Sequence, residues 1–129
     1  MYDEIIIISD LRGTIPVRNV LYKNGLEIPS SAKGELPTVV ITNGPVRAGF
    51  NGELISMILT FKNYNLNASN LSFNYDGEKL TGVYGETFIN FGSPIDLGTK
   101  ASALGSLLEN SVCSGEVRFV GPEEIIANC

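Results

Sequence analysis

Few residues of this chain are of the types that catalyse reactions or bind metal ions. Asp10 follows four consecutive isoleucines, which places a carboxylate at the end of a strongly apolar run. The sequence has no histidine, and this excludes His-ligated zinc, the Ser-His-Asp triad and the Cys-His pair. Its two cysteines, Cys113 and Cys129, are too few for an all-cysteine zinc site or a disulfide framework. We therefore expect no metal and no other cofactor.

The two cysteines leave two interpretations open. Cys129 could pair between subunits, but two free thiols in a reducing compartment are favoured. The first residues are acidic and the apolar run after them is short, which is not typical of a secretory signal. We therefore expect synthesis in a cytoplasm.

One glycine-containing segment, Gly92–Lys100, partly matches a phosphate-binding loop. Its order is Gly-Thr-Lys rather than Gly-Lys-Thr, and the glycine spacing differs from that of the motif. Phosphate binding is therefore not expected there.

Length and charge limit the classes of partner. A chain of 129 residues predicts a single domain, 1–129. The net charge is −5, and the positive charge is concentrated in residues 11–50. This balance argues against a strong polyanion binder, although a small patch could still bind RNA. No apolar run is long enough for a membrane helix, and neither membrane nor DNA is expected as a partner.

Short β-forming runs separated by turn residues predict a sheet-rich domain. Glu4–Ser9 and Thr14–Tyr22 predict an N-terminal hairpin within residues 1–23, and Thr38–Thr42 predicts a further strand. Asp76-Gly77 is a favoured hairpin turn, so residues 71–91 predict two paired strands.

The apolar residues of the segment Glu53–Lys62 fit both the two-residue period of a strand and the 3.6-residue period of a helix. As a strand it presents one apolar face made by Ile55, Met57, Leu59 and Phe61; as a helix it presents Leu54, Ile58 and Phe61. We favour the strand. A main sheet over residues 37–92 would follow.

One helix is indicated near the end of the chain. Ser93 and Pro94 resemble an N-cap and the first helical position, and apolar residues recur at helical spacing as far as Asn110. Residues 93–129 thus predict a helix and a closing tail.

Asp10 lies in Ser-Asp-Leu-Arg-Gly-Thr-Ile, which resembles the first motif of haloacid dehalogenase-type phosphatases, Asp-x-Asp-Gly-Thr. That resemblance implies a nucleophilic Asp10. Arg12 stands where the family has its second Asp, so the alternative it supports is a degenerate α/β domain with weak or no phosphatase activity. Further fragments follow in the family's order: Thr38–Asn43, Gly92-Ser93-Pro94 and Val120-Gly121-Pro122, with Ser93 in place of a lysine and Pro122 in place of a magnesium-binding Asp.

The order of elements along the whole chain resembles that of coat proteins of single-stranded RNA bacteriophages: an opening hairpin at Glu4–Tyr22, a meander over Thr38–Phe91, a helix at Asp96–Asn110 and a closing segment. The resemblance implies a dimer, a capsid assembled from further copies, a virion location and packaged single-stranded RNA. The RNA-facing residues that it implies share polar or aromatic side chains on the expected inner sheet face; they are Ser56, Thr60, Lys62, Asn74 and Tyr84.

The sequence therefore predicts an α+β fold, with an antiparallel sheet meander, an N-terminal hairpin and a C-terminal helix, completed by dimerisation. The expected function is non-enzymatic: a structural protein that self-assembles into a capsid. The phosphatase-like domain is the alternative.

Overall fold

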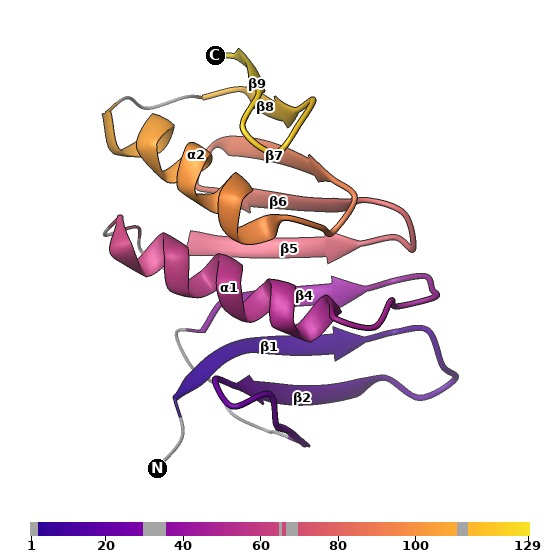
Figure 1. Ribbon diagram of the computed structural model, residues 1–129. Helices are drawn as coiled ribbons and strands as arrows, with labels where there is room; N and C mark the ends of the chain where they lie inside the picture. Colours follow the sequence, from indigo (N-terminus) through magenta and orange to yellow (C-terminus); the bar gives the residue numbers. More distant parts are fainter. Residues whose placement is uncertain (1–2, 30–35, 65, 67–69, 111–113) are drawn as a thin grey trace.

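Nine strands form one sheet, and both helices cover the same face of it (Figure 1). The computed structural model describes residues 3–29, 36–64, 66, 70–110 and 114–129. In chain order the elements are β1 (Glu4–Asp10), β2 (Val17–Tyr22), β3 (Glu27–Pro29), β4 (Thr38–Ile41), α1 (Phe50–Asn63), β5 (Leu71–Tyr75), β6 (Leu80–Tyr84), β7 (Thr87–Gly92), α2 (Leu97–Asn110), β8 (Glu116–Phe119) and β9 (Ile125–Asn128).

The sheet is mixed, with the strand order β3-β2-β1-β4-β5-β6-β7-β8-β9. The pairs β1/β4, β4/β5 and β7/β8 are parallel, and the other five pairs are antiparallel. Neighbouring parallel strands need a long crossover, and α1 and α2 are the crossovers for β4/β5 and β7/β8. The α+β class, the N-terminal hairpin and the meander β5–β7 are confirmed, whereas a wholly antiparallel sheet is not found.

The strand predicted over Glu53–Lys62 is wrong, because this segment lies inside α1. The helix buries Leu54, Met57, Ile58 and Phe61, which follow the 3.6-residue period of one helical face. The expected strand face had included Ile55, which is only partly buried.

The predicted C-terminal helix is confirmed as α2, and it packs closely on α1. Two glycines allow this approach: a Cβ added at Gly98 would lie 2.5 Å from Ser56 Oγ, and one at Gly105 would lie 2.6 Å from the Tyr64 ring. The hydroxyl groups of Tyr64 and Ser102 form a hydrogen bond of 2.8 Å between the helices. The helices therefore form one layer over the sheet.

The main core lies between this helical layer and the sheet. One cross-strand row facing the helices runs through Ile8, Val39, Phe73, Gly82, Ile89 and Val117.

The opposite sheet face carries different residues. Near the N-terminal hairpin this face is not exposed to solvent: the cross-strand pair Ile7 and Val20 lies on it, and both residues are buried. Over β5–β9 it is open and largely polar. Its exposed or half-buried side chains there include Ser72, Asn74, Thr81, Val83, Phe88, Asn90, Glu116, Arg118 and Ile126.

Candidate functional site

Asp10 and Arg12 form a closed ion pair at the carboxyl end of β1. Arg12 Nη2 donates to Asp10 Oδ2 at 2.7 Å, and Arg12 Nε donates to Asp10 Oδ1 at 2.9 Å. The Arg12 backbone N–H also donates to Oδ1, at 3.0 Å. These hydrogen bonds hold the pKa of Asp10 below its usual value. Both carboxylate oxygens are thus engaged by the guanidinium, an arrangement that orients the β1–β2 loop.

Of the three further fragments that resemble phosphatase motifs, one lies beside Asp10 and two lie far from it. Thr42 follows β4, the parallel neighbour of β1, and its hydroxyl donates to the Tyr75 carbonyl at 3.2 Å. The other two fragments follow β7 and β8, which lie four and five strand positions from β1. At about 4.8 Å per strand this separation is about 20 Å. The described residues contain no group of three or more acidic, Cys or His side chains that could hold a metal ion.

The residues predicted to face RNA do not share one surface. Ser56, Thr60 and Lys62 lie on α1, where Thr60 Oγ1 donates to the Ser56 carbonyl. Tyr84 is half-buried and packs against the core. Asn74 is exposed on the open sheet face, on the other side of the sheet from α1. The expected inner face depended on a strand at Glu53–Lys62, and the helix there removes that arrangement.

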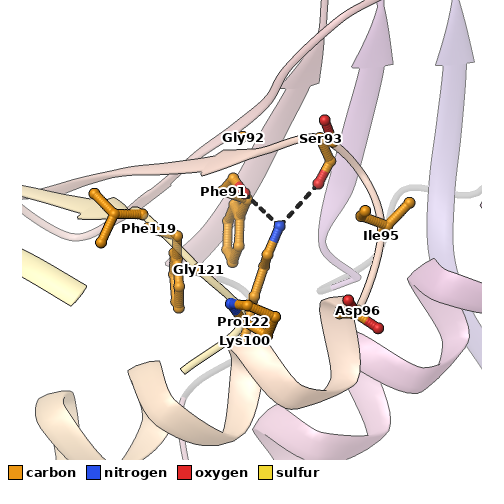
Figure 2. A pocket seen from close by; sticks show the side chains of 10 residues that line it. Phe91, Gly92, Ser93, Ile95, Asp96, Lys100, Phe119, Gly121 and Pro122 are labelled. Carbon is orange, nitrogen blue, oxygen red and sulfur yellow. Dashed lines mark hydrogen bonds between the residues drawn. The ribbon is translucent and has the colours of Figure 1, made fainter. Parts of the chain in front are cut away.

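A buried lysine lies at the carboxyl end of β7, where α2 begins. Lys100 is only 6% exposed, and its Nζ donates to the carbonyls of Phe91 at 2.7 Å and Ser93 at 3.0 Å, as Figure 2 shows. Burial lowers the pKa of the ammonium group, while the carboxylates of Asp96 and Glu53 oppose that shift. The adjoining cavity of about 240 Å³ is walled partly by the β8–β9 turn. The lysine thus holds the strand-to-helix turn in place.

The N-terminus of α2 is capped by a carboxylate from α1. Glu53 Oε2 accepts from the Asp96 N–H at 3.2 Å, and Oε1 accepts from the Leu97 N–H at 3.0 Å. In the segment Gly92–Lys100, two backbone N–H groups and the lysine are therefore engaged by the protein itself.

We predict that Glu53→Ala lowers the free energy of unfolding by about 0.5–2 kcal/mol, because it removes the carboxylate that caps α2. Urea denaturation measures the loss. Glu123→Ala removes an exposed carboxylate from the β8–β9 turn and serves as the matched control. An equal effect of the two substitutions would show that the Glu53 cap contributes nothing.

The sequence predicts a closing tail where the structure has β9, the last strand of the sheet. β9 pairs with β8 alone, and three of its four residues are exposed. Ile126 is 42% exposed beside Arg118 on the open sheet face. The alternation Glu116–Phe119 followed by Ile125–Asn128 was the available signal, since Val120–Glu124 contains the glycine and proline of a turn.

Cys129, directly after β9, is disulfide-bonded, so the free-thiol prediction is wrong for this residue. Cys113 lies outside the described residues. A disulfide fits an oxidising compartment better than a reducing one.

Comparisons with known protein families, curated protein sequences and solved structures found no match. Among the described residues, neither helix has the length and apolar character needed to span a membrane.

Proposed function

We propose that this chain is a non-enzymatic binding domain that docks an extended strand of a partner protein on the free edge of β9. The observation that carries the proposal is the contrast between the two edges of the sheet. An edge strand offers unpaired N–H and C=O groups to another strand, and many domains use this mode to bind peptides.

The β3 edge is poorly suited to pairing. The strand has three residues, and Pro29 at its end has no N–H to donate. Glu27 places a carboxylate on the same strand, where it accepts from Asn51 Nδ2 at 2.9 Å. Short length, proline and charge are the features by which natural sheets discourage edge pairing.

The β9 edge is also short, with four residues, but it lacks the proline and the charge. Its sequence, Ile125–Asn128, contains no charged residue and no proline. It is also anchored, because Ile125 packs against the core and its hairpin partner Phe119 stacks on Phe91 with ring centroids 5.6 Å apart. A rigid edge is preorganised for an incoming strand, which lowers the entropic cost of binding.

The register identifies the groups available to a partner. At the hairpin end the Val120 N–H donates to the Glu124 carbonyl at 3.0 Å. Hydrogen-bonded pairs alternate along an antiparallel ladder, so Ile126 and Asn128 make the next bonds to β8. The N–H and C=O groups of Ile125 and Ala127 consequently point away from β8 and toward the open edge.

Ala127→Pro provides a selective test, because it deletes an outward N–H while leaving the bonds between β8 and β9 intact. We expect peptides selected from a random decapeptide library against the wild-type domain to bind this variant at least about tenfold more weakly. Ala127→Val is the matched control: it adds similar bulk and keeps the N–H.

Amide exchange locates the contact. Bound peptide is expected to slow exchange of the Ala127 N–H, measured by NMR. Selected peptides that bind Ala127→Pro as tightly as the wild type, or that protect amides elsewhere, would refute the proposal.

A second candidate is assembly of copies of this chain through the same edge, and the capsid expected from the sequence order belongs to this class. It is favoured by the absence of charge on β9, since nothing there opposes pairing with a second β9. Size-exclusion chromatography with light scattering, read at 260 and 280 nm, separates the candidates. Megadalton particles rich in nucleic acid support the capsid, and a monomer supports docking of a partner.

A further inference from the structure

The arrangement of chain connections identifies one place in the sheet where a crevice forms. β1 and β4 are adjacent and parallel, so their carboxyl ends lie at the same edge. From β1 the chain turns back to β2 on one side, and from β4 it crosses through α1 to β5 on the other. In open sheets, ligands bind where neighbouring parallel strands have connections that leave in opposite directions.

The structure has a cavity of about 250 Å³ at this position. Its apolar wall includes Ile41, Val46 and Phe50, at the end of β4 and the start of α1. Its polar wall includes the Asp10–Arg12 ion pair and, from the hairpin side, Asn19 and Glu27. The cavity therefore combines aliphatic and aromatic surface with charged groups.

The charges that line this cavity do not balance. Arg12 is engaged by Asp10 through two side-chain hydrogen bonds, and no cation among the described residues pairs with the Glu27 carboxylate. Within this part of the chain, Glu27 is held by neutral amides: Asn51 Nδ2 donates to Oε2 at 2.9 Å, and Asn19 Nδ2 donates to Oε1 at 3.4 Å. Amide donors orient a carboxylate and do not neutralise it, so one negative charge remains at the cavity.

An unsatisfied acceptor lies beside this carboxylate. Among the described residues, the Oδ1 atom of Asn19 is buried and has no hydrogen-bond partner. Leaving such an acceptor unpaired costs about 1–3 kcal/mol. The orientation of the amide is fixed by the other end of the group, because Nδ2 faces the Glu27 carboxylate. This atom is covered by the protein, so the group that the cavity offers to a ligand is the Glu27 carboxylate.

We propose that this cavity binds an alkylammonium group, supplied either by a free aliphatic amine or by a lysine side chain of a peptide. The ammonium group carries the positive charge that Glu27 lacks, and its methylene chain lies against Val46 and Phe50. This site is separate from the β9 edge, eight strand positions from β3 and six from β1, so either proposal can fail alone.

The test is an NMR titration of the whole chain with n-butylammonium, read at the side-chain amide signals of Asn19 and Asn51. Saturable shifts of both signals are expected. Butyrate, which has the opposite charge, is expected to leave them unchanged. Glu27→Gln should weaken n-butylammonium binding at least about tenfold, because it removes the unpaired charge. Glu78→Gln removes an exposed carboxylate from the β5–β6 turn and is the matched control.

A second arm identifies the source of the ammonium group. Nα-acetyl-lysine amide binding more tightly than n-butylammonium points to a peptide lysine, and the reverse order points to a free amine. Asn51→Ala, which leaves the Glu27 charge in place, should keep measurable binding and so separates loss of charge from loss of fold. Equal affinity of the wild type and Glu27→Gln for n-butylammonium, or shifts that spread over all acidic residues without saturation, would overturn the proposal.

Discussion

Replacing Phe91 with alanine should lower the free energy of unfolding by about 3–5 kcal/mol, the range found when buried aromatic side chains are truncated. Phe91 is fully buried between the sheet and α2. Its ring stacks on Phe119 at a centroid distance of 5.6 Å and contacts Phe73 at 6.0 Å. The cavity left by alanine cannot close, because β6 approaches here through Gly82, where an added Cβ would lie 3.2 Å from the Phe91 ring. Urea denaturation followed by circular dichroism measures the loss.

Phe88 provides the matched control for this prediction. It lies on the same strand, three residues earlier, but points to the open face of the sheet and is 43% exposed. Phe88→Ala should change the free energy of unfolding by less than about 1 kcal/mol. Similar losses for the two substitutions would mean that both faces of β7 are covered, in conflict with a single helical layer.

The parts of the fold that the sequence predicts are those governed by local signals. Four consecutive isoleucines predict a buried strand, and Ile5–Ile8 are all buried in β1. Asp76-Gly77 predicts the β5–β6 turn, where Asp76 Oδ1 accepts from the backbone N–H groups of Glu78 and Lys79 at 2.9 and 2.8 Å. Apolar residues at helical spacing predict α2, although the helix begins at Leu97 and not at Pro94 as expected.

The parts that were missed depend on contacts distant in sequence. Glu53–Lys62 satisfies both the strand and the helix period, so the choice depends on its surroundings. β4 pairs with β1 in parallel instead of forming a hairpin with the next strand, and a parallel β4/β5 pair requires a crossover that only a helix supplies here. No local sequence pattern predicts that β4 pairs with β1.

The candidate sites likewise have parts that local sequence signals predict and parts that depend on contacts distant in sequence. Asp10 was singled out from its place after an apolar run, and it does lie at the carboxyl end of a strand. Its ion pair with Arg12 is local, two residues along the chain. Glu27 and the Asn19 amide lie near it only because β2 and β3 fold back beside β1. The residues predicted to face RNA do not lie on one face, because that prediction assumed strand alternation in a segment where helical periodicity applies.

Lys100→Met should also destabilise the chain strongly. The substitution keeps an unbranched side chain of similar length but removes the ammonium group that bonds the carbonyls of Phe91 and Ser93. The Phe91 bond is buried, and each buried acceptor left unpaired costs about 1–3 kcal/mol. Lys62→Met makes the same chemical change at an exposed position of α1 and should be nearly neutral.

The pH dependence of the Lys100→Met effect tests its cause. Burial lowers the pKa of Lys100 in the folded chain, whereas the unfolded chain keeps a value of about 10.4. Between these two values the unfolded state binds more protons, so the contribution of Lys100 to stability rises with pH across that window. The difference in free energy of unfolding between the wild type and Lys100→Met should therefore widen as pH rises through the lowered pKa toward 10.4. A difference that narrows over this range would show that the folded state favours the charged lysine, and that Asp96 and Glu53 outweigh the cost of burial.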